Sequence, residues 1–300
     1  MVCILSLLIP YIVTLAWTGR VEEKREIPLI TSGKKIILDR KNGESYIDVE
    51  EYLPGVVARQ IPADYGREAL RAQAIIARTY IYGKMNGHNE VKESELSMNY
   101  LEEKQMELLW GSETFVTYYE TVEEAVRSTA GMVITCDGKL IEPLFHRVST
   151  GKTRAGDEAH PYLQSVDSKA DVEADGYLTV MAWSPEEFVG KLGGLPECGD
   201  ILPEQALESV QVVVRDESGY VQEIMVGMKT YTGDEVRFVL GLPSAAFSLE
   251  AYEGEIRAVC QGIGHGYGLS QYGARVRAES GETAEDILAY FYKNIVLISE

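Results

Sequence analysis

The stretch of this chain that is richest in chemically active side chains is residues 261–274, where five glycines alternate with polar and aromatic residues. Glycine has no Cβ, so its backbone can approach a ligand or another strand closely. His265, Ser270, Gln271 and Tyr272 supply hydrogen-bond donors, acceptors and a ring that can stack on a sugar. We therefore predict a sugar-type binding site at these four side chains. Two other interpretations stay open: a tight bend before a helix that begins near Leu269, and a phosphate loop, although no Walker lysine follows.

A second group of possible ligands lies between His146 and His160, with Asp157 and Glu158 in between. Nitrogen and oxygen ligands at this spacing can hold a metal ion. Histidines near a hairpin more often make structural hydrogen bonds, so we expect no metal and no other cofactor. Residues 151–153 read Gly-Lys-Thr, but the first glycine of a Walker motif is missing because position 146 is histidine.

The elements that must position these side chains follow from the periodicity of apolar residues. Alternating patterns predict hairpins over residues 34–49 and 132–148, turning at Lys41-Asn42-Gly43 and Asp137-Gly138, and a strand pair at 208–214 and 221–226. Helical spacing or capping residues predict helices at 50–61, 65–85 and 114–129, after Ser184, and at 283–293. Helices and strands do not alternate strictly, which favours an α+β fold of mixed helices and antiparallel hairpins in one compound globular unit.

Composition limits the partners of this chain. Asp and Glu total 47 against 28 Lys and Arg, a formal net charge of -19, which would repel a nucleic-acid backbone. We therefore expect no nucleic-acid partner. The cysteines are too far apart in sequence for a CxxC knuckle or a readable disulfide framework, so isolated thiols are expected at Cys3, Cys136, Cys198 and Cys260.

The N-terminal residues 2–17 are uncharged and apolar, slightly shorter than the roughly 20 residues of a membrane span. We expect residues 1–18 to form a membrane anchor or uncleaved signal, residues 19–33 a spacer, and residues 34–300 one domain. Arg20, Lys24 and Arg25 oppose export by the positive-inside rule, and a start upstream with further basic residues would reconcile them with it. The alternative is a buried N-terminal element.

Several ordered motifs make the chain resemble the stage II sporulation protein D and amidase-enhancer family. Residues 264–274 are similar to its GHGxGxSQYGA signature. Further similar motifs are spread over about residues 47–298, in segments 49–58, 68–74, 77–80, 149–153, 161–166 and 285–292. The resemblance implies peptidoglycan remodelling in sporulation at the extracytoplasmic face of the cytoplasmic membrane. The implied partners are glycan strands and a cell-wall amidase, and the N-terminal segment adds the membrane.

The activity implied by the resemblance is that of a lytic transglycosylase acting on glycan stripped of stem peptides. In this chemistry the muramyl 6-hydroxyl attacks its own anomeric carbon, and one carboxylic acid protonates the leaving oxygen and then assists deprotonation. The family places this glutamate just before a proline, where the chain reads Arg59-Gln60-Ile61-Pro62. An amide has no transferable proton near neutral pH, and loss of acid-base help typically costs about 10²–10⁴-fold.

Three further site residues follow from the resemblance. Arg78 and Tyr162 match its functional arginine and tyrosine, and Arg78 would pair with the lactyl carboxylate of the sugar. The other interpretation is that Arg78 pairs with Glu68 or Asp64 within the fold. Gln164 stands where the family favours lysine, so a second ionisable group is replaced by an amide.

Three interpretations therefore remain open. The first is a lytic transglycosylase whose catalytic position holds Gln60, with Asp64 or Glu68 as substitute acid or with weak residual catalysis. Alternatively, it is a non-catalytic glycan-binding scaffold that stimulates a cell-wall amidase. A third interpretation is an exported adhesive domain with a decayed site.

Overall fold

Two hydrophobic cores organise the residues that the computed structural model describes, which are 31–40, 43–98 and 100–300. These residues belong to one compact unit that spans 31–300, and helices and antiparallel strands are mixed throughout it. The predicted α+β class is confirmed. The apolar segment 2–17 lies outside the described residues. None of the helices within the described ranges is both long and apolar enough to cross a membrane.

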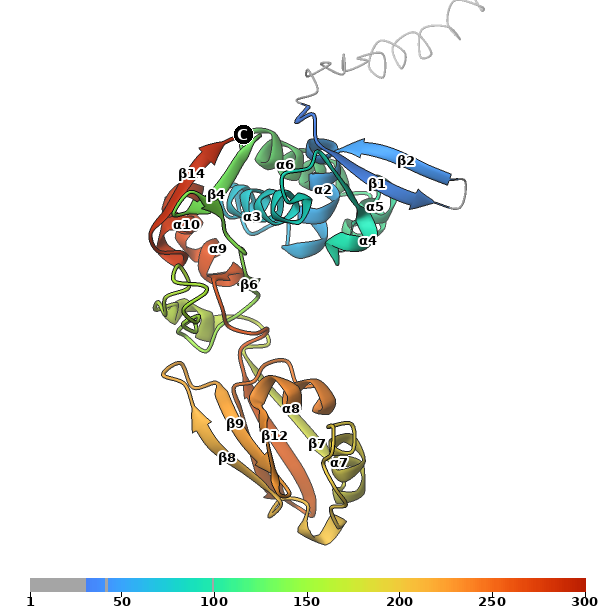
Figure 1. Ribbon diagram of the computed structural model, residues 1–300, viewed down its shortest axis with the longest axis vertical. Helices are drawn as coiled ribbons and strands as arrows, with labels where there is room; N and C mark the ends of the chain where they lie inside the picture. The colour runs from blue at the N-terminus through green and yellow to red at the C-terminus, as the bar shows by residue number, and fades with distance from the viewer. Residues whose placement is uncertain (1–30, 41–42, 99) are drawn as a thin grey trace, which may run out of the picture. The chain divides into compact units, whose positions relative to one another are not determined.

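The first core surrounds α3 (Arg67–Met85), whose apolar stripe of Leu70, Ala74, Ala77 and Ile81 is almost inaccessible to solvent. The alanines of α3 allow neighbouring helices to approach it closely. The helices that pack against α3 are α2 (Val49–Gln60), α6 (Phe115–Arg127), α9 (Gln271–Glu279) and α10 (Ala284–Phe291) (Figure 1). The helices predicted at the positions of α2, α3, α6 and α10 are confirmed. The shorter α4 (Glu93–Leu96) and α5 (Glu103–Trp110) lie beside α3 and α6 respectively.

Small sheets flank this first core. The predicted hairpin at 34–49 is confirmed as β1 (Lys35–Arg40) and β2 (Gly43–Asp48). Residues 41 and 42 of its turn lie outside the described residues. A third strand, β3 (Glu90–Lys92), pairs with β1. β4 (Met132–Cys136) lies between β5 (Lys139–Leu140) and β14 (Ile295–Ser299). The second arm of the hairpin at 132–148 was predicted too long. It ends at Leu140, and β6 (Phe145–His146) pairs instead with β13 (Leu269–Ser270).

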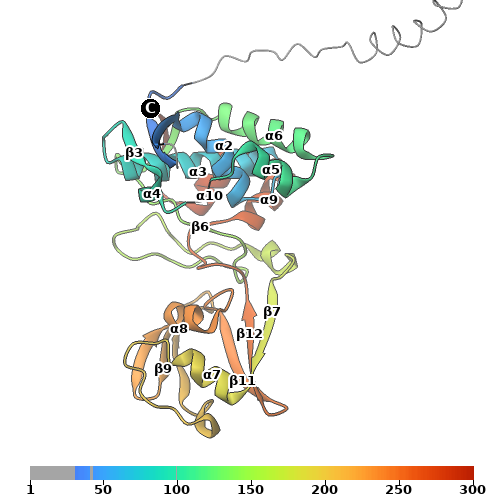
Figure 2. The ribbon, with the colours of Figure 1, turned by 90° about the vertical axis from the view of Figure 1, so that its right-hand side faces the viewer.

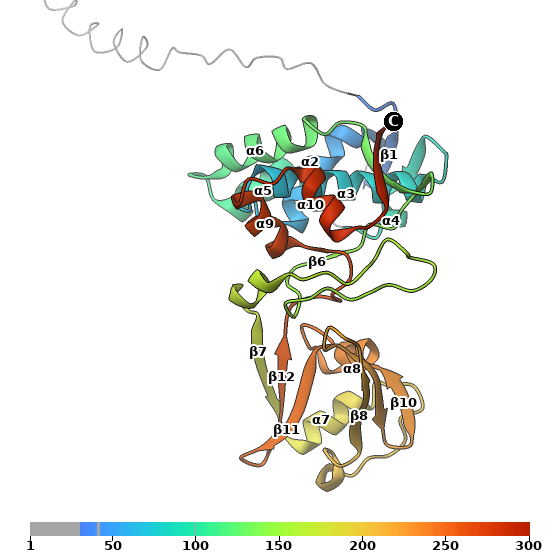
Figure 3. The same cartoon turned by 90° about the vertical axis from the view of Figure 1, so that its left-hand side faces the viewer.

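The second core lies within residues 178–261. One sheet comprises β7 (Leu178–Trp183), β11 (Phe247–Tyr252) and β12 (Glu255–Gln261) (Figure 3). Another comprises β8 (Val210–Arg215), β9 (Val221–Val226) and β10 (Lys229–Thr232). Helices α7 (Pro185–Leu192) and α8 (Gly233–Leu240) belong to the same core (Figure 2), and short 3-10 turns η1 (Lys169–Glu173) and η2 (Pro203–Gln205) occur nearby in sequence. The predicted strand pair and the capping box at Ser184 are confirmed.

Candidate functional site

Gln60, the last residue of α2, lies where two pockets meet. The first pocket, of about 600 Å³, is lined by Tyr80 from α3 and is called the Tyr80 pocket. The second, of about 530 Å³, contains Trp110 from α5 and is called the Trp110 pocket. Arg59 and Gln60 line both. A third pocket of about 280 Å³ shares Tyr80 and Pro143 with the first, so the three pockets are neighbours and together are called the groove.

A chain of three amides fixes the side chain of Gln60. Nε2 of Gln271 donates to the backbone oxygen of Gln60 at 2.8 Å and to Oε1 of Gln73 at 3.1 Å. Nε2 of Gln73 donates in turn to Oε1 of Gln60 at 2.8 Å. A backbone carbonyl can only accept, so it fixes the orientation of the Gln271 amide and hence of the other two. The NH₂ group of Gln60 is left pointing away from Gln73.

This arrangement makes residue 60 a hydrogen-bond donor that holds no acidic proton. An amide NH₂ can bind a hydroxyl, ring or carbonyl oxygen of a ligand, but it cannot protonate a leaving oxygen. Among the described residues that line the two pockets beside Gln60, Asp64 is the sole carboxylate. Glu68 is committed elsewhere, because its Oε2 accepts from Arg71 at 2.6 Å and from the backbone of Ala284 at 2.9 Å.

The structure does not bring Arg78 to the groove. Its side chain is fully buried in the first core, and its guanidinium makes two hydrogen bonds of 2.7 Å to the carboxylate of Glu50. Further hydrogen bonds reach the backbone oxygens of Val126 and Met132. These contacts support the interpretation of Arg78 as one half of a structural ion pair. Its partner is Glu50, and not Glu68 or Asp64 as the sequence suggested.

Tyr162 and Gln164 also lie apart from Gln60. The Tyr162 ring is buried in the first core, and its hydroxyl accepts from the backbone N–H of Glu142 and donates to the backbone oxygen of the same residue. Tyr162 therefore fixes the backbone of Glu142, which lines the third pocket, but Tyr162 itself does not line that pocket. The Gln164 side chain is exposed to solvent. Neither residue lines the groove as predicted from the resemblance.

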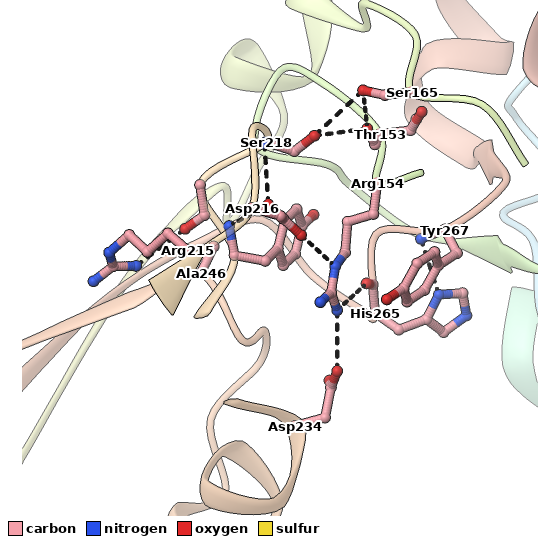
Figure 4. Close-up of polar contacts among 12 residues, drawn as sticks. Thr153, Arg154, Ser165, Arg215, Asp216, Ser218, Asp234, Ala246, His265 and Tyr267 are labelled. Carbon is pink, nitrogen blue, oxygen red and sulfur yellow. Dashed lines mark hydrogen bonds and ion pairs between the residues drawn. The ribbon is translucent and has the colours of Figure 1, made fainter. Parts of the chain in front are cut away.

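His265 does not line the groove, and its ring packs beside the rings of His146 and Tyr267. Figure 4 shows Arg154 at the centre of its surroundings: the guanidinium contacts Asp216 at 2.7 Å, Asp234 at 3.0 Å and the backbone oxygen of His265 at 3.4 Å. Nδ1 of His265 accepts a hydrogen bond from the backbone of Tyr267. Burial lowers the pKa of the His265 imidazole to about 4, so the ring is neutral near pH 7.

The glycines of this segment serve close backbone packing. A Cβ at Gly268 would collide with the backbone oxygen of Leu144, and one at Gly264 would lie 2.7 Å from Cβ of His146. Both residues have positive φ angles, which glycine adopts without strain. The segment thus follows the interpretation of a tight bend between a strand and a helix: the bend follows β12 and ends at the short β13, which leads directly into α9.

Of the remaining predicted binding residues, only Gln271 lines the groove. Ser270 caps α9, accepting from the backbone of Gly273 and donating to the buried carboxylate of Asp171. Burial raises the pKa of that carboxyl group. The Tyr272 ring meets Tyr65 edge to face. The four residues of the predicted site therefore do not lie together. His265, Ser270 and Tyr272 make structural contacts, and Gln271 lies beside Gln60.

The sequence patterns did not point to Gln73, which fixes Gln60, or to the groove residues Trp110, Arg59 and Arg147. One of them carried a usable signal: Gln73 is a polar residue among the alanines of the most apolar helix, and a buried amide needs hydrogen-bond partners. Trp110 and Arg147 lie far from Gln60 in sequence, and neither they nor its neighbour Arg59 carried such a signal.

Comparisons with known proteins find relatives that match most of the chain. A family model described as "Stage II sporulation protein" matches residues 41–136, which include α2 and α3. Stage II sporulation protein D of Bacillus amyloliquefaciens is 33% identical over 261 residues, covering 83% of this chain and 74% of that protein. Its Bacillus subtilis (strain 168) counterpart is 33% identical over 263 residues, covering 82% and 73%. An amidase enhancer of the same strain is 26% identical over 298 residues, covering 82% and 40%.

Proposed function

Because this chain belongs to the stage II sporulation protein D family, we propose that it has a cell-wall role in sporulation and binds peptidoglycan glycan in the groove beside Gln60 without cutting it. The observation that carries the proposal is the orientation of Gln60, whose NH₂ group is a fixed donor where an acid would be needed. We also propose that the apolar N-terminal segment holds the domain at the extracytoplasmic face of the membrane.

The lining of the groove supports a sugar ligand. The Trp110 pocket contains the rings of Trp110 and Tyr118, and the Tyr80 pocket contains Tyr80 and Phe145. Aromatic faces with a few polar groups are typical of sites that bind ligands by stacking and oriented hydrogen bonds. Adjacent pockets that share Gln60 suit a polymer, because a strand can occupy more than one of them.

The test is to incubate the full-length chain with denuded glycan, measure binding by co-sedimentation, and search for 1,6-anhydromuramyl products by mass spectrometry. We expect wild-type protein to bind glycan and release no product, and Gln60→Glu to release product. Gln164→Glu is the matched control, because it makes the same change of amide to acid at an exposed position outside the groove. Product from wild-type protein, or failure to bind glycan, would contradict the proposal.

The relative named amidase enhancer supports a second part of the proposal, that the bound chain stimulates a cell-wall amidase. Adding the full-length chain to an amidase and intact peptidoglycan should raise the rate of stem-peptide release. If the chain binds glycan but leaves this rate unchanged, the amidase part fails while glycan binding stands.

A further inference from the structure

The third pocket of the groove carries two opposite charges that do not neutralise each other. Lys84, in the last turn of α3, and Glu142, between β5 and β6, both line this pocket and are both exposed to solvent. Within residues 31–40, 43–98 and 100–300, Lys84 has no carboxylate at ion-pair distance, and its ammonium lies 5.2 Å from the centroid of the Tyr80 ring. A ligand that bears both charges could therefore contact each group with the opposite charge.

The protein holds Glu142 in place from two sides. The hydroxyl of Tyr162 hydrogen-bonds the backbone N–H of Glu142 at 3.0 Å and its backbone oxygen at 3.2 Å. Oε2 of Glu142 lies 3.4 Å from Nε2 of His160, whose Nδ1 lies 2.6 Å from Oδ1 of Asp157. The hydrogen bond to Asp157 raises the pKa of His160, and because a carboxylate can only accept, the imidazolium is the form that can donate to both. Glu142 is thus fixed at backbone and side chain.

The walls between the two charges are apolar. Leu140, Ile141, Pro143 and the ring of Tyr80 complete the lining. The volume of about 280 Å³ lies just below the roughly 300–1,000 Å³ of pockets for drug-sized ligands, which suits one branch of a larger ligand. Tyr80 and Pro143 also line the Tyr80 pocket, so such a branch can belong to a strand that lies beside Gln60.

We propose that the third pocket binds the stem peptide of peptidoglycan, through an amino-acid residue that carries a free ammonium beside a free carboxylate. The ammonium faces Glu142 and the carboxylate faces Lys84, each in a charge-assisted contact. The proposal rests on the proposed function, because glycan in the Tyr80 pocket brings its peptide to the third pocket. An amidase acts only where stem peptides remain, so binding of this form matches the proposed amidase role.

Calorimetric titration of the full-length protein tests the pocket with three tetrasaccharides of alternating N-acetylglucosamine and N-acetylmuramic acid. The first carries tripeptides that end in meso-diaminopimelate. The second carries tripeptides that end in lysine, which keeps the side-chain ammonium but lacks the carboxylate beside it, and the third carries no peptide. We expect the first probe to bind about tenfold more tightly than the third and several-fold more tightly than the second.

Two substitutions assign the two contacts. Lys84→Gln removes the partner of the carboxylate and should bind the first and second probes equally. Glu142→Gln removes the partner of the ammonium and should reduce the advantage of the first probe over the third several-fold. Lys169→Gln and Glu217→Gln are the matched controls, at side chains that are 86% and 91% exposed and outside the groove, and both should keep the wild-type order of affinities. Thermal unfolding verifies that each variant is folded.

Three results would overturn the peptide site. Equal binding of the three probes by wild-type protein would show that the pocket takes no peptide, although glycan binding would stand. Equal binding of the diaminopimelate and lysine probes would show that Lys84 recognises no carboxylate. An advantage of the diaminopimelate probe that persists in both Lys84→Gln and Glu142→Gln would place peptide recognition elsewhere. Failure to bind any of the three tetrasaccharides would instead refute the proposed function itself.

Discussion

Nε2 of Gln73 donates a 2.8 Å hydrogen bond to Oε1 of Gln60, so a side chain from the centre of α3 sets the orientation of the last residue of α2. Gln73 is fully buried, and its own oxygen accepts from Gln271 on α9. Three helices thus converge on one amide at the junction of two pockets. The donor character of residue 60 therefore depends on a network and not on its residue type alone.

Gln73→Leu should uncouple this network. It removes the donor that holds Oε1 of Gln60 and the acceptor of one Gln271 hydrogen, and an unsatisfied buried polar group costs about 1–3 kcal/mol. We expect the free energy of unfolding to fall by about this amount and glycan affinity to fall as well, measured by urea titration and co-sedimentation. Gln164→Leu, at an exposed amide, should change neither. A folded Gln73→Leu variant with unaltered glycan affinity would argue against a binding role for the oriented amide.

Arg78 should prove essential to stability instead of ligand binding. Arg78→Met leaves the nearly buried Glu50 without its partner, and breaking a buried ion pair costs about 3–5 kcal/mol. Arg67→Met is the control: it breaks an equally short but half-exposed pair with Glu124, for which we expect a loss of less than about 1 kcal/mol.

Removing both partners, as in Glu50→Leu/Arg78→Met, should recover part of the lost stability, because no buried charge is then left alone. Chemical denaturation measures all three effects. If Arg78→Met unfolds like wild-type protein but no longer binds glycan, the substrate contact implied by the family resemblance would replace the structural role.

Two buried histidines make stability depend on pH. Burial lowers the pKa of both His146 and His265 from 6.5 to about 4. Between these values the unfolded chain takes up protons that the folded protein does not, so the free energy of unfolding falls as pH drops from 6.5 towards 4. The slope is at most about 1.4 kcal/mol per pH unit for each histidine. Above pH 6.5 their contribution is fully retained.

His146→Gln should remove one histidine's share of this slope, as measured by urea unfolding at several pH values from about 4 to 7.5. The difference in slope between this variant and wild-type protein separates the contribution of His146 from those of the carboxylates and of His160. The pKa of His160 is raised by its hydrogen bond to Asp157. His88→Gln, at an exposed histidine, should keep the wild-type slope. An unchanged slope in His146→Gln would show that this ring does not titrate on unfolding in the window.

Local patterns in the sequence predicted the elements better than the site. Capping residues and apolar periodicity found α3, α7 and the hairpin of β1 and β2 because these signals act within a few residues. The ion pair of Arg78 with Glu50 and the contact of Gln271 with Gln73 join residues 28 and 198 positions apart, which no local pattern encodes. His265 and Gln271 share one glycine-rich segment, yet the bend at Gly268 sends them to different surroundings.

Asp64 offers the sharpest distinction between holding and cutting glycan. It is the carboxylate of the Trp110 pocket, whereas Glu68 is bound to Arg71 and to the start of α10, so Asp64 is the better placed of the two substitute acids that the sequence suggested. If the groove only binds, Asp64→Asn should tighten binding of denuded glycan several-fold, because the lactyl carboxylates of that glycan are free and the substitution removes a like charge beside them. Calorimetry measures this gain, and Asp167→Asn, outside the pocket, is the matched control. Release of 1,6-anhydromuramyl product by wild-type protein and its loss in Asp64→Asn would instead make Asp64 the acid and the chain an enzyme.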